Sequence, residues 1–205
     1  MSGCCDGGCP AGALQQEQQR RTLKAVLGIN AIMFVVIAGA AIYGGSTALL
    51  ANSFDNFGDA LTYALSLYAV SRGKSTKAKV ALFKGMLILL AALIVSGQII
   101  YKIFVPGLPI FEAMGIFGVL SLIANSICLY LLWRHRHEDV NMSSVWECSR
   151  NDIVSDLSVI VAAGAVWLLG SGWPDIIVAL ALVVLLYRSA FRVIFSAKKE
   201  LSNAA

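Results

Sequence analysis

The sequence has few charged residues and little of the polar surface that a soluble domain needs. Aspartate, glutamate, lysine and arginine make up only 14% of the 205 residues, whereas hydrophobic residues make up 58%. Soluble domains carry about 25% charged residues, and the mean hydropathy of +0.76 lies far from their near-even balance. The composition therefore excludes an ordinary soluble globular domain.

The motifs of common enzyme classes are also missing. No segment resembles a glycine-rich nucleotide loop, a set of catalytic serine, histidine and aspartate residues, or a redox pair of cysteines. The net charge of +4 comes from basic clusters beside apolar segments, so it does not require a nucleic-acid partner. We therefore expect neither an enzyme nor a tightly bound cofactor.

Long apolar segments recur along the chain. Each has roughly 20 residues, enough for a helix to cross about 30 Å of hydrocarbon, and the alternating pattern of barrel strands is absent. We predict an all-α, polytopic membrane protein whose six transmembrane helices lie at roughly 24–43, 47–71, 80–104, 110–133, 145–169 and 174–195. The expected organisation is an N-terminal tail (1–22), a six-helix membrane domain (23–196) and a short C-terminal tail (197–205).

Basic residues predict the orientation of these helices. They cluster at 20–24, 72–79, 134–136 and 198–199, and with six spans all four clusters fall on one side. The positive-inside rule makes that side cytoplasmic. We expect an integral protein of the cell (inner) membrane with both termini in the cytoplasm.

Two acidic pairs interrupt the apolar sequence. Asp55 and Asp59 in the second segment, and Asp152 and Asp156 in the fifth, both follow the pattern D-x-x-x-D, which places each pair on one helix face. A charge at the centre of a membrane helix costs about 2.5 to 3.5 kcal/mol, so we interpret these carboxylates as ligands of a cation. Since the two helices run antiparallel, Asp55 should lie nearer Asp156, and Asp59 nearer Asp152. The alternative is that individual carboxylates merely pair with Lys84 or with hydroxyl groups.

The second segment resembles a family signature. Residues 46–59, STALLANSFDNFGD, are similar to the pattern S-x-A-L-L-A-D-A-x-[HD]-x-x-x-D of cation diffusion facilitators, and residues 172–175, GWPD, open the sixth segment as in that family. The resemblance covers roughly residues 25–195. It implies a six-helix exporter of divalent cations, commonly driven by proton antiport, with two metal ligands from the second helix and two from the fifth.

The fifth segment departs from the family pattern and leaves two alignments open. If Asp152 matches the second ligand of that helix, Cys148 takes the place of the usual histidine or aspartate, and Asp156 is an added acid one turn away that serves as a fifth ligand or a proton acceptor. If the acidic pair matches instead, Asp152 and Asp156 are the ligands. We favour the first alignment because it keeps the spacing to the sixth helix, and Asp152 is a ligand in both.

The ligand types predict a class of cargo. Three carboxylates and a thiolate suit Zn²⁺, Cd²⁺ or Co²⁺, whereas carboxylates alone suit harder ions such as Mn²⁺ or Mg²⁺, so we expect a divalent cation of the Zn, Cd, Co, Mn or Fe class. Crowded carboxylates in a low dielectric hold protons when no metal is bound, and metal binding releases them. Protons are therefore the expected counter-ion.

Both ends of the sequence bear on regulation. Cys4, Cys5 and Cys9 in the N-terminal tail could capture a soft metal ion, although an unstructured tail with incidental cysteines is the favoured interpretation. Family members typically continue after the sixth helix into a cytoplasmic domain that commonly dimerises them, and this sequence is expected to lack it. A homodimer thus stays an open alternative, as does a non-transporting, metal-responsive membrane subunit or sensor.

Overall fold

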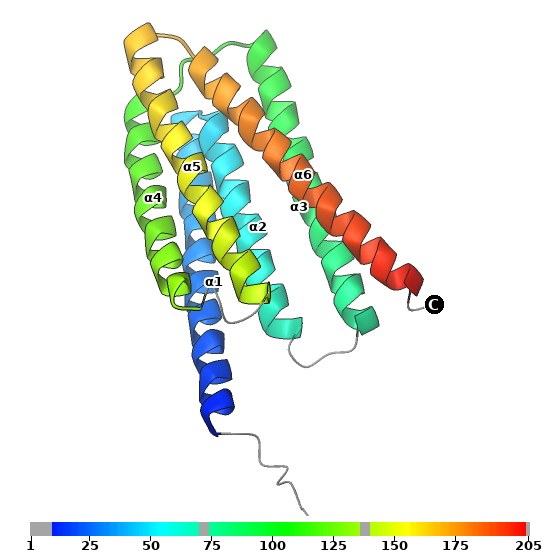
Figure 1. Cartoon of the computed structure of the whole chain (residues 1–205). Coiled ribbons are helices and arrows are strands. Elements are labelled where there is room, and N and C mark those ends of the chain that lie inside the picture. The colour runs from blue at the N-terminus through cyan, green and yellow to red at the C-terminus, as the bar shows by residue number, and fades with distance from the viewer. Residues whose placement is uncertain (1–9, 70–73, 136–139, 204–205) are drawn as a thin grey trace, which may run out of the picture.

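The computed structural model describes residues 10–69, 74–135 and 140–203, and in these ranges the chain is helical and contains no strand. The six helices are α1 (Pro10–Gly44), α2 (Thr47–Ala69), α3 (Lys74–Phe104), α4 (Phe111–Trp133), α5 (Val140–Leu169) and α6 (Trp173–Asn203). Figure 1 shows them as one bundle. We call the end with the α1–α2, α3–α4 and α5–α6 connections the upper end; α1 begins and α6 ends at the lower end. The all-α prediction is confirmed.

Four helices, α1, α3, α5 and α6, extend beyond the predicted apolar segments at the lower end. α1 begins at Pro10, so residues 10–22 of the expected tail continue the first helix, and α6 continues to Asn203. Glutamine, glutamate, lysine and arginine are good helix formers, so hydropathy marks the membrane-spanning part of a helix but not its end. An ion pair at 2.5 Å between Arg21 and Glu17, one turn apart on α1, illustrates this polar extension.

Two of the upper connections turn at glycines with positive φ. Gly45 has φ +58° and Gly170 has φ +56°, the left-handed conformation that ends many helices. The Gly170 N–H donates to the Val166 carbonyl, and the Ser46 N–H donates to the Ala41 carbonyl. Consecutive helices can therefore reverse direction within very few residues.

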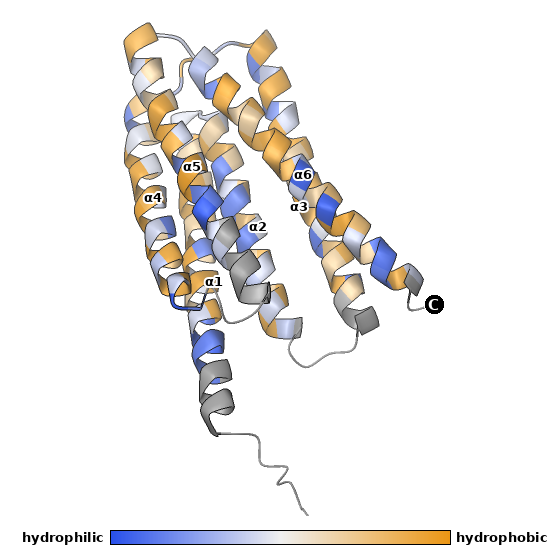
Figure 2. Cartoon of the chain, in the orientation of Figure 1, coloured by the Kyte–Doolittle hydropathy of each residue, from blue (hydrophilic) through white to orange (hydrophobic). Residues whose placement is uncertain are grey.

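Five of the six helices are long and apolar enough to cross a membrane. These spans are Glu17–Gly44, Ala78–Phe104, Phe111–Trp133, Ser149–Leu169 and Trp173–Ser202. The chain is therefore an integral membrane protein, whereas a crossing by α2 stays a prediction. α2 contacts each of the other five helices, so the bundle shields its hydrophilic residues, which Figure 2 marks in blue along the ribbon.

The core joins all six helices through small and branched side chains. Its fully buried members include Ile37 on α1, Leu49 on α2, Val95 on α3, Met114 on α4 and Val159 on α5. Buried alanines on each of the six helices let the backbones approach closely, as is typical of membrane bundles. α3 packs most extensively on α6, and these two helices lie to one side of α1, α2, α4 and α5 (Figure 1).

Candidate cation site between α2, α5 and α6

The two acidic pairs meet where α2 packs against α5. The Asp55 carboxylate interacts electrostatically with Asp59 and Asp156, and Ser155 is a hydrogen-bond partner of Asp55. The carboxyl group of Asp59 lies within hydrogen-bonding reach of Asp152. The pairing expected for antiparallel helices, Asp55 with Asp156 and Asp59 with Asp152, is therefore confirmed.

Three of the four carboxylates line one cavity. It has a volume of about 540 Å³ and is bounded by α2, α5 and α6. Its lining consists of Asp55, Asp59, Asn151, Asp152, Val154, Ser155, Ser158, Ala181, Leu182, Leu185, Arg188, Ser189 and Arg192. Carboxylates and hydroxyls supply oxygen ligands for a cation, and the volume leaves room for an ion that keeps part of its water shell.

Asp156 has a different environment. It is fully buried and does not line the cavity. The Asn52 side-chain amide donates to Asp156 Oδ1 at 2.8 Å, and the Asn125 amide donates to Asp156 Oδ2 at 2.8 Å. The Ser121 hydroxyl donates in turn to Asn52 Oδ1 at 3.2 Å. Asp156 therefore joins α2, α4 and α5 through a hydrogen-bonded network.

Two further side chains act on Asp59. The Tyr63 hydroxyl donates to Asp59 Oδ2 at 3.0 Å, and the Tyr63 side chain is fully buried. Lys84 on α3 donates to the Thr62 hydroxyl and interacts electrostatically with Asp59. The alternative that single carboxylates pair with Lys84 is therefore supported only for Asp59, which interacts with this lysine and also lines the cavity.

Sequence analysis did not identify Tyr63, Asn125, Arg188 or Arg192. Tyr63 stands four residues after Asp59, a spacing that places both on one helix face and could have revealed it. Asn125 and the two arginines are polar residues within apolar segments, and this position alone could have marked them as candidate functional residues. Asn52 was visible only as a departure from the family signature.

The cysteines contribute less to the described site. Cys148 lies on α5 one turn before Asp152, but its side chain lies outside the described part of the structure, as do Cys4, Cys5 and Cys9. Cys128 on α4 is fully buried and accepts a hydrogen bond from the Asn30 amide at 3.6 Å. Among the described side chains, no three histidine, cysteine, aspartate or glutamate residues converge on a common point. The carboxylates thus form pairs around a cavity rather than a closed metal centre.

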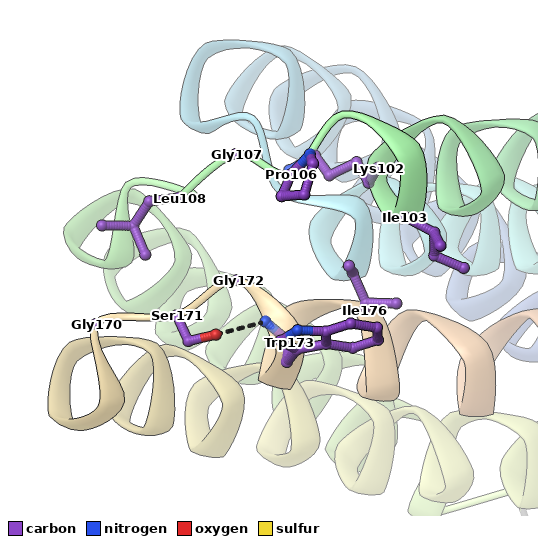
Figure 3. A pocket seen from close by; sticks show the side chains of 10 residues that line it. All are labelled: Lys102, Ile103, Pro106, Gly107, Leu108, Gly170, Ser171, Gly172, Trp173 and Ile176. Atoms are coloured by element: carbon purple, nitrogen blue, oxygen red, sulfur yellow. Dashed lines mark hydrogen bonds between the residues drawn. The ribbon is translucent and has the colours of Figure 1, made fainter.

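A second cavity lies at the upper end, and its chemistry is unlike the first. It has a volume of about 250 Å³ and lies between the α3–α4 and α5–α6 connections (Figure 3). Its lining contains no acidic residue, and its only charged member is Lys102. That lysine donates to the Gly45 carbonyl and lies 3.9 Å from an oxygen of Asp175, so the cavity offers no ligand set for a cation.

Asp175, near the start of α6, anchors the upper end. Its carboxylate is fully buried and accepts hydrogen bonds from the Ser46 hydroxyl at 2.6 Å, the Thr47 N–H at 2.8 Å and the Ala48 N–H at 3.0 Å. These backbone groups begin α2, where helical N–H groups lack partners within the helix. Asp175 therefore caps α2, and through Lys102 it ties α6 to α3.

Comparison with known proteins assigns this arrangement to a family. The family model of the cation efflux transmembrane domain matches residues 23–202. No curated protein matches the chain.

Proposed function

Since the chain belongs to the cation efflux family, whose members are transporters rather than enzymes, we propose that it exports a divalent transition-metal cation through the cavity between α2, α5 and α6. The observation that carries this proposal is that Asp55, Asp59 and Asp152, from two helices, line one cavity. Because α2 contacts every other helix, a cation bound to it could be released by a shift of the surrounding bundle.

The ligand set that we propose is Asp55, Asp59, Asp152 and Cys148. Asp156 is placed outside it because both of its oxygens accept amide hydrogens and it does not face the cavity. With a thiolate in the set, Zn²⁺, Cd²⁺ and Co²⁺ are the preferred cargo, whereas Mn²⁺ and Fe²⁺ rely on the carboxylates. No resident cofactor takes part.

Protons are the counter-ion in this mechanism. Three carboxylates around one cavity repel each other when all are ionised, so an empty site takes up protons. A divalent cation that binds must displace them, and the return of protons helps to release it. The exchange of one cation for protons follows from the same side chains that bind the cargo.

The direction of transport follows from the charge distribution. The described basic residues at 20–24, 74–79, 134 and 198–199 belong to the lower ends of their helices, and we propose that this end faces the cytoplasm, with both termini there, in the cell (inner) membrane. The cavity lining includes Arg192, nearly five turns along α6 from the upper anchor Asp175, so it reaches toward the lower end. Cargo would therefore enter from the cytoplasm, and Cys4, Cys5 and Cys9 could deliver soft ions to this opening.

Metal flux into proteoliposomes tests the proposal. Wild-type protein should move Zn²⁺, Cd²⁺ or Mn²⁺ and move protons in the opposite direction, whereas Asp55→Asn and Asp152→Asn should reduce flux to that of empty liposomes. Glu112→Gln, which changes an exposed acid at the start of α4 outside the cavity, should transport normally. Normal flux in both aspartate variants would refute the site. A sensor or subunit, the alternative function, would bind the cation without moving it.

A further inference from the structure

The carboxylate cavity also contains two arginines. Arg188 and Arg192 lie one turn apart on α6, and both line the cavity together with Asp55, Asp59 and Asp152. They belong to the segment Trp173–Ser202, which is long and apolar enough to cross a membrane. Both side chains are exposed at the border of the cavity, and ionisable residues within a membrane-spanning helix commonly serve a function. In a cavity proposed for a cation, two fixed positive charges require an explanation.

The upper anchor places these charges relative to the acids. Asp175 on α6 binds the backbone N–H of Thr47, so α2 and α6 both descend from this common level. At 1.5 Å per residue, Asp59 lies about 18 Å along α2 from Thr47, and Arg188 lies about 20 Å along α6 from Asp175. Arg192 lies about 26 Å along the same helix. These lengths agree with the lining of the cavity, which Arg188 and Asp59 share, and Arg192 lies one turn farther along α6 from the anchor.

Arginine keeps its charge under all physiological conditions, whereas a carboxylate can lose its charge by taking up a proton. With every group ionised, three carboxylates and two arginines leave the cavity nearly neutral. Without the arginines, the carboxylates would attract a divalent cation much more strongly. A transport site must bind its cargo weakly enough to release it, and a nearby fixed positive charge has that effect.

We propose that Arg188 and Arg192 are resident counter-ions of the carboxylate cavity, which stabilise it when it is empty and limit its affinity for the cargo. This inference rests on the proposed transport function. It assigns to α6, which contributes no ligand, the role of setting how tightly α2 and α5 hold the cation.

Cation binding by the purified full-length chain tests this role. Titration calorimetry with Zn²⁺, Cd²⁺ and Mn²⁺ at low ionic strength should show about tenfold tighter binding for Arg188→Gln and for Arg192→Gln, with a larger gain in the double variant. Raised salt should shrink these differences through screening. Arg188→Lys, which keeps the charge, should bind like the wild type, and so should Lys199→Gln, which removes an exposed charge of α6 outside the cavity lining.

A second measurement keeps the inference separate from the proposed function. The double glutamine variant should melt at a lower temperature than the wild type without metal, and saturating cation should abolish that difference. Glutamine variants with wild-type affinity, or Arg188→Lys behaving like Arg188→Gln, would overturn the counter-ion role even if the wild type transports. If the wild type moves no cation, the proposed function fails, and the melting temperatures without metal still decide whether the arginines stabilise the carboxylates.

Discussion

The bundle holds its buried carboxylates in two different environments. At the upper end, Asp175 accepts hydrogen bonds from one hydroxyl and two backbone N–H groups and lies beside Lys102. In the middle of the bundle, Asp55, Asp59 and Asp152 line an open volume shared with two arginines. In the first environment, one carboxylate, that of Asp175, accepts three hydrogen bonds from neighbouring groups of the bundle. The second gathers several carboxylates and leaves room between them.

This difference separates structural acids from ligand-binding acids. A buried carboxylate whose two oxygens both accept hydrogen bonds from the fold is held by those donors, and its first role is to stabilise the packing of the helices. Asp156 shows that sequence spacing does not decide which kind an acid is. It forms a D-x-x-x-D pair with Asp152, yet each of its two oxygens accepts a hydrogen bond from a buried amide. We therefore group Asp156 with Asp175 rather than with its neighbour in sequence.

The largest effect on stability should come from Asp175→Asn. The amide would present an NH₂ group to one of the two N–H donors of α2 and would leave Lys102 buried without its counter-charge. We expect the free energy of unfolding to fall by about 3 kcal/mol, measured by denaturation of the metal-free protein in detergent. Cation affinity should be unchanged, and Lys102→Met combined with Asp175→Asn should recover part of the loss. If Asp175→Asn abolishes cation binding without lowering the stability, Asp175 belongs with the ligand-binding acids and not with the structural acids.

Cys148→Ser should have the next largest effect, on selectivity. A hydroxyl is a poor ligand for soft metals, so the ratio of Cd²⁺ to Mn²⁺ affinity should fall by about 100-fold if the thiolate is a ligand. Competition between the two ions in a binding assay measures this ratio, and Cys128→Ser, which changes the buried thiol on α4, is the matched control. An unchanged ratio, together with lost binding in Asp156→Asn, would support the acidic pair as the ligands of α5.

Asp156→Asn should destabilise the protein without stopping transport. Asn52 and Asn125 both donate to Asp156, and an amide can accept from only one of them, so one donor would face another donor. The expected cost is about 1 to 2 kcal/mol in the free energy of unfolding. Flux should stay within about threefold of the wild type, because the residue lies outside the cavity lining. A complete loss of flux at normal stability would return Asp156 to the cargo site.

The sequence was sufficient to predict the six helices and the pairing of their acids. Apolar length determines where helices lie, and i, i+4 spacing with antiparallel helices determines which carboxylates meet. At the lower end, α1, α3 and α5 begin before their predicted starts and α6 ends after its predicted end, because lysine, glutamine and glutamate continue a helix beyond the apolar segment. These predictions depend on local pattern alone.

The remaining contacts depend on how the helices rotate and cross. Asn125 meets Asp156 from a different helix, and Lys102 meets Asp175 across 73 positions of sequence. Arg188 lines the same cavity as the acids, on a helix that is anchored to the start of α2 through Asp175. One sequence shows which residues share a face of one helix, but the face that a neighbouring helix presents is set by packing of the whole bundle.

The smallest effect should come from Tyr63→Phe, which tests how Asp59 is held. The Tyr63 hydroxyl donates to Asp59 Oδ2, so it fixes the rotamer of a cavity-lining carboxylate from one turn away on α2. Its removal should weaken cation binding about fivefold by calorimetry, because partners that orient a ligand contribute less than the ligand itself. Tyr187→Phe is the control: it removes a hydroxyl that contacts Ser96 between α3 and α6, outside the cavity lining, and should leave affinity unchanged. If both variants lose stability equally and neither loses affinity, Tyr63 supports packing alone, and Asp59 is oriented by Asp152 and the surrounding helices.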